Sequence, residues 1–402
     1  MFFKIKTKKN YIIYFIIIVF GIFLSRVVGY GDDIDTHRLI HTYLNVIENG
    51  IYLPSRYYGS PLAEFIIGFF SYFFGGIILA FISYILFILS LNFLFIYYFK
   101  NQEKLFVNKK IIFFILCISN SVLLFDNINP SDYILSLFFF SFGLFLLKTN
   151  YKFYSSILFS FSIACRANFA IFVIVILILE FILATKKDIK KNIFNIFVNT
   201  IIISSLFYLP VTILNKFNLN FIYNDGGPEI SVEQLLPRFI YKSYMLLGIY
   251  NSLIFLGLFI FILIKSKIKS IKNFIIQEKK YLALIIFNLV VFFFMPTKTA
   301  LISFVVIFFY LFLIKNFNNK LLVIIIIFNI LYWIISYQIL EIKYKYEDPC
   351  RAKHAIDANY KFNISEGFYF SKTKEIRRRI KCDSVTFKEK NEKYYKNNKL
   401  SE

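Results

Sequence analysis

The chain has 402 residues, of which 58% are hydrophobic, and its mean hydropathy is +0.64. Several apolar runs approach the ~20 residues that cross a bilayer, so the composition excludes an ordinary soluble domain and indicates a polytopic membrane protein. The formal net charge is +22, but Lys and Arg cluster in the short gaps between apolar runs, as they do in cytoplasmic loops. This placement argues against a nucleic-acid partner.

The first predicted element is a transmembrane helix at residues 11–25, and its basic flank "MFFKIKTKKN" predicts a cytoplasmic N-terminus. The apolar core is long and no small-x-small cleavage site follows it, so we expect a membrane anchor and not a cleaved signal. Residues 26–62 then form the first extracytoplasmic loop. Residues 63–72, before "FGG", are apolar but too short to cross, and they are predicted to form an interfacial or re-entrant half-helix.

The later apolar runs predict spans that alternate in direction. Every loop assigned to the inside is Lys-rich, and the loops assigned to the outside carry most of the acidic residues, which supports this topology. The spans are predicted at residues 73–99, 111–125, 133–147, 154–164, 169–184, 193–209, 239–264, 281–294, 301–314 and 321–340.

The predicted fold class is therefore all-α: a polytopic membrane protein with about eleven transmembrane helices, an interfacial helix in the first loop and a small polar tail. Residues 1–340 form the membrane domain. Residues 341–402 form a basic tail, which we expect to be extracytoplasmic and partly disordered. Cys350 and Cys382 lie in this tail, and whether they form a disulfide stays open.

The first loop opens with "GDDIDTHR", which holds Asp32, Asp33 and Asp35. Apolar residues at helical spacing predict a helix over residues 35–49, which lies along the membrane surface and ends at Gly50. Capping this helix needs one aspartate or two. Three acids beside a membrane boundary therefore favour a chemical role for at least one of them.

Asp33, His37 and His41 are spaced four residues apart and share one face of the predicted helix. This spacing suits the ligands of a divalent metal. Solvated histidines at the interface give the same pattern, so both interpretations stay open.

The same loop continues as "LPSRYYGSPLAEF", in which Pro54 and Pro61 fix the backbone and Gly59 permits a tight turn. We expect Arg56 and Glu64 near the interface. The planar guanidinium of an arginine suits a phosphate group, and an arginine that reaches toward lipid head groups is the alternative.

Other charged residues fall on the same predicted side of the membrane. Asp126 and Asp132 border the outer turn "DNINPSD", Arg166 lies in "CRAN" at the outer end of a span, and Lys298 lies in "MPTK". Ionisable residues in or beside spans are functional candidates because their burial is costly. Together these residues predict an outer pocket for an anionic group, with a carboxylate available as a general base.

In this order the motifs resemble those of GT-C-type glycosyltransferases, the membrane enzymes that include the protein mannosyltransferases and the aminoarabinose transferases. The resemblance rests on "GDDIDTHR", "SRYYGSPLAEF", "DNINPSD", "CRAN" and "MPTK", and it covers roughly residues 11–313. The tail from residue 341 has no counterpart.

The resemblance implies transfer of a sugar from a polyprenyl-phosphate-linked donor to a glycan, lipid or protein acceptor. It implies an integral protein of the bacterial cytoplasmic membrane with an extracytoplasmic active site. Some members need a divalent cation such as Mg²⁺ or Mn²⁺, and this chain's need stays open. The implied roles are a catalytic base for Asp32, Asp33 or Asp35, donor phosphate binding for Arg56, Arg166 and Lys298, and acceptor binding or auxiliary roles for His37, Tyr57, Glu64, Asp126 and Asp132.

Two other classes of membrane protein use lipid-linked sugars. An envelope polysaccharide polymerase typically carries a large late loop rich in Arg and His, whereas the charged loop comes first here. A lipid-linked sugar flippase or transporter predicts paired, broken spans with charges near the midplane. The predicted spans here are nearly uncharged at mid-depth, so the transferase is preferred.

Overall fold

The computed structural model describes residues 8–30, 34–56, 59–99, 103–149, 151–214, 216, 235–237, 239–240, 257, 284–290, 293 and 299–338. This part of the chain is almost entirely helical and contains no strand, as the predicted all-α class requires. Its helices are α1 (Lys8–Val28), α2 (Ile34–Asn49), α3 (Pro61–Phe99), α4 (Glu103–Ser119), α5 (Ser121–Ile128), α6 (Asp132–Leu147), α7 (Lys152–Cys165), α8 (Phe169–Leu183), α9 (Lys187–Leu214), α12 (Thr299–Asn316) and α13 (Asn319–Gln338).

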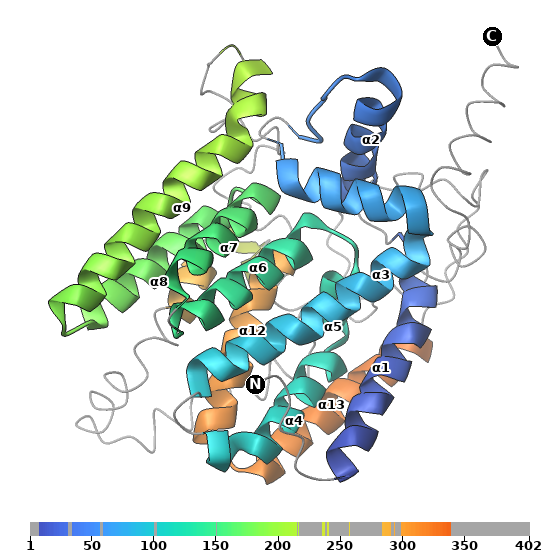
Figure 1. Cartoon of the computed structure of the whole chain (residues 1–402). Helices are drawn as coiled ribbons and strands as arrows, with labels where there is room; N and C mark the ends of the chain where they lie inside the picture. The colour runs from blue at the N-terminus through green and yellow to red at the C-terminus, as the bar shows by residue number, and fades with distance from the viewer. Residues whose placement is uncertain are drawn as a thin grey trace, which may run out of the picture.

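The helices pack as a bundle around a large apolar core. The long lower part of α3 lies between α1 and α6, α6 packs on α7, and α7 packs on α9 (Figure 1). Helices α12 and α13, far along the chain, pack against α4. The first half of the sequence therefore supplies one side of the bundle, and the late helices close the other.

Two of the described helices, α3 and α9, are long and apolar enough to cross a membrane. The shorter apolar helices include α6, α7 and α8. Most predicted spans up to residue 209 and after residue 300 coincide with helices, but the count of about eleven transmembrane spans stays a prediction. The spans predicted at 239–264 and 281–294 fall largely outside the described residues, and the tail at 341–402 falls wholly outside them.

Helix α3 consists of two arms that meet at Gly75. The backbone there has φ 78° and ψ 176°, a conformation that is essentially restricted to glycine. Figure 1 shows the first arm crossing the top of the bundle and the second arm turning down through it. The break lies within "FGG", three residues after residue 72, where the sequence predicts the half-helix to end.

Helix α2 packs on the first arm of α3, and its bounds agree closely with the predicted 35–49. Leu39, Ile40 and Leu44 are buried in a second, smaller apolar cluster at this contact, and each such side chain contributes about 1.5–3 kcal/mol on burial. Gly50, with φ 67°, ends the helix and donates its N–H to the carbonyl of Val46. Gly50, with its left-handed backbone conformation, is therefore the C-terminal cap that the sequence predicts.

One predicted span is wrong in detail. The apolar run at 111–125 is not continuous, because α4 ends at Ser119 and α5 begins at Ser121. Asn120 makes the break: its Oδ1 accepts the N–H of Leu123, and its Nδ2 donates to the hydroxyl of Tyr310 in α12. The break thus depends on a contact with a helix far along the chain.

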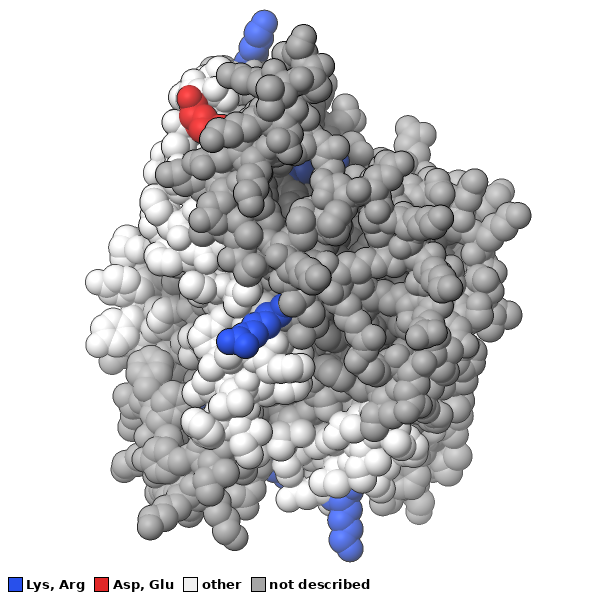
Figure 2. All heavy atoms as spheres, turned by 90° about the vertical axis from the view of Figure 1, so that its right-hand side faces the viewer, with Lys and Arg blue, Asp and Glu red and all other residues white. Residues whose placement is uncertain are grey.

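Charged side chains are sparse on one face of the molecule. Figure 2 shows mostly uncharged side chains among its described residues, with a few separate Lys or Arg side chains and an acidic one near the top. Large apolar side chains are exposed along α8 and α9, among them Ile178, Ile182, Ile202 and Leu206. A surface of this kind suits contact with lipid chains.

Candidate functional site

Two arginines from different parts of the chain meet on one carboxylate. Arg56, in the loop between α2 and α3, donates from Nη1 to Oδ2 of Asp132 at 2.8 Å. Arg166, which follows α7, donates from Nη1 to the same oxygen at 2.7 Å. The side chain of Asp132 is fully buried, and those of the arginines are 9% and 7% exposed. We call these three residues the arginine cluster.

The arginine cluster carries an excess of positive charge. Two guanidinium groups, which stay charged in proteins, face one carboxylate, so the three side chains sum to one net positive charge if Asp132 is ionised. Arginine forks also recognise phosphate and carboxylate groups, so a pair of arginines of this kind is compatible with an anionic ligand.

Neighbouring side chains fix the arginine cluster in place. The guanidinium of Arg166 lies 3.6 Å from the centroid of the Tyr133 ring, an attractive cation–π arrangement. Ser60 Oγ lies 3.4 Å from Oδ2 of Asp132. Asp132 itself stands in the first turn of α6, where the helix dipole favours a negative side chain.

A second buried carboxylate lies in the same region. Glu64, in the first turn of α3, is fully buried. Its Oε1 accepts the N–H and Oγ–H of Ser55 at 2.8 and 2.6 Å and the N–H of Ser60 at 3.0 Å. Its Oε2 accepts the hydroxyl of Tyr52 at 2.7 Å. We call Tyr52, Ser55 and Ser60 the Glu64 cradle.

Burial and the adjacent Glu64 carboxylate raise the pKa of Tyr52 far above its ordinary value. The folded protein therefore keeps this phenol protonated, whereas the unfolded chain ionises it near pH ~10. The contribution of Tyr52 to stability is complete below that pH and is lost as the pH rises above it. We expect the unfolding free energy of the wild type to fall more steeply above pH ~10 than that of Tyr52→Phe, by about 1.4 kcal/mol per pH unit. Parallel pH curves for the two proteins in chemical denaturation would contradict this.

The start of α2 is tied to the loop before Asp132. The hydroxyl of Thr36 donates to the carbonyl oxygen of Pro130, and both residues are buried. Thr36 directly follows Asp35. This hydrogen bond therefore holds the N-terminal end of α2 against the segment that leads into α6.

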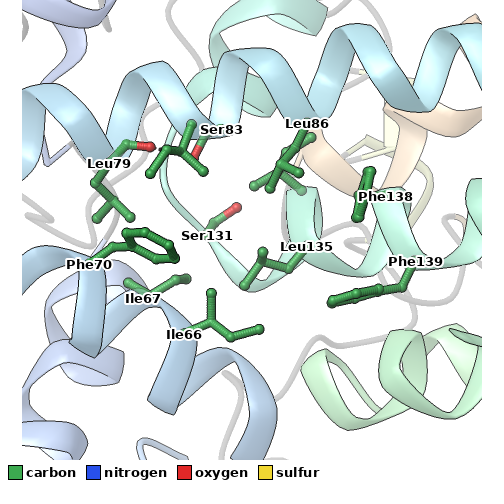
Figure 3. A pocket seen from close by; sticks show the side chains of 12 residues that line it. Ile66, Ile67, Phe70, Leu79, Ser83, Leu86, Ser131, Leu135, Phe138 and Phe139 are labelled. Atoms are coloured by element: carbon green, nitrogen blue, oxygen red, sulfur yellow. Dashed lines mark hydrogen bonds between the residues drawn. The ribbon is translucent and has the colours of Figure 1, made fainter. Parts of the chain in front are cut away.

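An apolar cavity of about 230 Å³ lies between the two arms of α3 and α6. Figure 3 shows Ile66, Ile67 and Phe70 from the first arm, Leu79 and Leu86 from the second, and Leu135 and Phe139 from α6 around it. Ser131, the residue before Asp132, is also part of the lining. The apolar cavity therefore reaches the residue that precedes Asp132, although none of the three residues of the arginine cluster is part of its lining.

Comparison of the chain with protein-family models, curated proteins and solved structures finds no match.

The structure brings together some of the predicted site residues. Arg56, Asp132 and Arg166 form one cluster, Glu64 lies beside the loop that carries Arg56, and Asp126 is buried in α5. His41 is exposed on α2, and the backbones of Asp35 and His37 lie in that helix. The predicted residues Asp32, Asp33, Tyr57 and Lys298, and the side chains of Asp35 and His37, lie outside the described residues.

The described carboxylates of this region do not fit a divalent cation. Both oxygens of Glu64 accept hydrogen bonds, and Oδ2 of Asp132 faces two arginines, whereas hard cations prefer several oxygen ligands and few positive neighbours. Among the described residues, no three His, Cys, Asp or Glu side chains cluster as metal ligands. The predicted ligands Asp33 and His37 are not part of that set.

The sequence analysis did not single out Ser60 or Tyr52, which hold the site together. Ser60 was detectable, because Ser followed by Pro61 and then by an acid in the first turn is typical of a helix start. Tyr52 had no such signal, since its contact with Glu64 depends on how the loop folds back.

Proposed function

We propose that the protein is a membrane glycosyltransferase of the bacterial cytoplasmic membrane, which moves a sugar from a polyprenyl-phosphate-linked donor to an acceptor at the outer face. The observation that carries the proposal is the arginine cluster beside an apolar cavity. A polyprenyl phosphate has the matching chemistry, with an anionic head and an apolar chain. The apolar helices α3 and α9 support a membrane location.

In the proposed reaction, an aspartate among Asp32, Asp33 and Asp35 takes the proton of an acceptor hydroxyl. The hydroxyl oxygen attacks the anomeric carbon of the donor sugar. The bond between that carbon and the phosphate oxygen breaks, and its electron pair stays on the departing polyprenyl phosphate. Arg56 and Arg166, with Lys298 as a further candidate, stabilise this developing charge.

Binding of farnesyl phosphate to the purified full-length protein in lipid nanodiscs tests the proposed ligand chemistry. We expect saturable binding by calorimetry, and we expect farnesol and inorganic phosphate to bind much more weakly because each lacks one half of the ligand. Arg56→Ala should weaken binding about tenfold or more, the effect of losing one charge-assisted contact. Arg26→Ala, which removes an exposed arginine at the end of α1, is the matched control. A wild-type protein that does not bind farnesyl phosphate would overturn the proposal.

A second assay separates transfer from transport. The protein is incubated with a panel of polyprenyl-phosphate-linked sugars, labelled in the sugar, and with a bacterial membrane extract as the source of acceptor. A transferase releases free polyprenyl phosphate and places the label on the acceptor. A transporter leaves the donor intact, and a polymerase produces longer lipid-linked glycans, and either result would replace the proposed function.

A further inference from the structure

The loop at 51–60, which joins α2 to α3, carries Arg56 and is closed on itself around Glu64. Ser55 and Ser60, which flank Arg56 on either side, both donate backbone N–H groups to Oε1 of Glu64. Within the loop, the N–H of Gly59 bonds the carbonyl of Arg56 at 2.9 Å. Ser55, the residue before Arg56, and Ser60, the last residue of the loop, are therefore fastened to the same carboxylate oxygen.

The carboxylate of Glu64 is well suited to fastening this loop and poorly suited to proton transfer. It is fully buried and accepts four hydrogen bonds from the Glu64 cradle. Hydrogen bonds to a charged group are stronger than neutral ones. Four donors occupy the oxygens that a general base would need.

Ser60 connects the two carboxylates of the site. Its N–H donates to Glu64, and its hydroxyl lies within hydrogen-bond distance of Oδ2 of Asp132. Gly59 has φ 69°, and a Cβ there would lie 2.9 Å from the side chain of Val211 in α9. The loop is thus in contact with Glu64, Asp132 and α9.

We infer that Glu64 is a positioning residue: it folds the loop at 51–60 so that the guanidinium of Arg56 meets Asp132 and Arg166. This refines the sequence-based expectation of an acceptor-binding or auxiliary role for Glu64. The link to ligand affinity rests on the proposed function, whereas the link to loop structure does not.

The experiment compares Glu64→Ala with Glu64→Gln in the full-length protein in nanodiscs. Alanine removes every acceptor. Glutamine keeps one oxygen that can accept from Ser55 and Ser60. Its amide N–H group can donate to the hydroxyl oxygen of Tyr52, which would then accept a hydrogen bond instead of donating one. Hydrogen exchange of peptides spanning residues 51–60 reports on the loop, and calorimetry with farnesyl phosphate reports on Arg56. Tyr52→Phe, which removes one donor and leaves the carboxylate, is the milder third variant.

For Glu64→Ala we expect exchange in this loop to accelerate about tenfold or more, as the loss of charged hydrogen bonds requires, with a similar loss of farnesyl phosphate affinity. Glu64→Gln, which keeps an acceptor oxygen and loses the charge, should fall between Glu64→Ala and the wild type in both measurements, and Tyr52→Phe should stay within about threefold of the wild type. Unchanged loop exchange in Glu64→Ala would overturn the inference. So would a Glu64→Gln protein as impaired as Glu64→Ala, because that result would show that the retained acceptor oxygen does not hold the loop. If the wild type does not bind farnesyl phosphate, the proposed function fails, and the exchange data still decide the role of Glu64.

Discussion

Replacing Asp132 by alanine is expected to lower the free energy of unfolding by about 3–5 kcal/mol, the cost of breaking a buried ion pair. The substitution leaves Arg56 and Arg166 close together, buried and without the carboxylate that they share. Chemical denaturation of the purified protein in detergent, followed by Trp and Tyr fluorescence or by circular dichroism, measures the loss.

Two further proteins make this result specific. Asp188→Ala also removes an aspartate from the first turn of a helix, α9, but at an exposed position, so its effect should stay within about 0.5 kcal/mol. The double variant Asp132→Ala/Arg166→Ala should recover part of the loss, because it also removes one of the two arginines that lose their shared carboxylate. An Asp132→Ala protein as stable as Asp188→Ala would show that the arginine cluster does not form.

Substituting Gly68 by alanine is expected to destabilise the protein by about 1–3 kcal/mol, the usual effect of overpacking a tight contact. A Cβ at Gly68 would lie 2.1 Å from Cβ and 2.4 Å from Cγ of Tyr43. These atoms are at the base of the Tyr43 side chain and cannot turn aside, so α2 must move away from the first arm of α3. Unfolding measurements and faster hydrogen exchange in α2 would show this.

Gly257 provides the matched control for Gly68. It is a helical glycine whose added Cβ would meet no atom within 4 Å. Gly257→Ala should be neutral or stabilise the protein by up to about 1 kcal/mol, because alanine is the better helix former. Equal stability of the two alanine variants would mean that α2 and α3 do not pack as closely as the structure has them.

Local signals in the sequence predicted much of the fold. The bounds of α2 followed from apolar residues at helical spacing and from Gly50, which adopts the expected left-handed conformation. The break in α3 followed from the short apolar run before "FGG", and Gly75 has the backbone conformation that such a break needs. These features depend on residues a few positions apart, which is why they could be predicted.

The break at Asn120 shows where such prediction stops. The run from residue 111 to 125 was predicted as one apolar span, although Ser119, Asn120 and Ser121 place three polar side chains within it. The structure ends α4 there because Asn120 caps α5 at Leu123 and also reaches Tyr310, 190 residues further along the chain. A contact at that separation depends on the packing of α12 and leaves no trace in local spacing.

For the candidate site too, the sequence predicted some features and the tertiary structure decided others. The sequence by itself determined which charged residues interrupt the apolar runs, among them Arg56, Asp132 and Arg166, because a charge beside a span is costly and therefore conspicuous. Only the tertiary structure decided that both arginines share one oxygen of Asp132, across separations of 76 and 34 residues. The packing of the helices' apolar faces determines which charged residues meet across such separations. The entropy cost of closing a long loop rises only slowly with loop length, so it does not favour one partner over another.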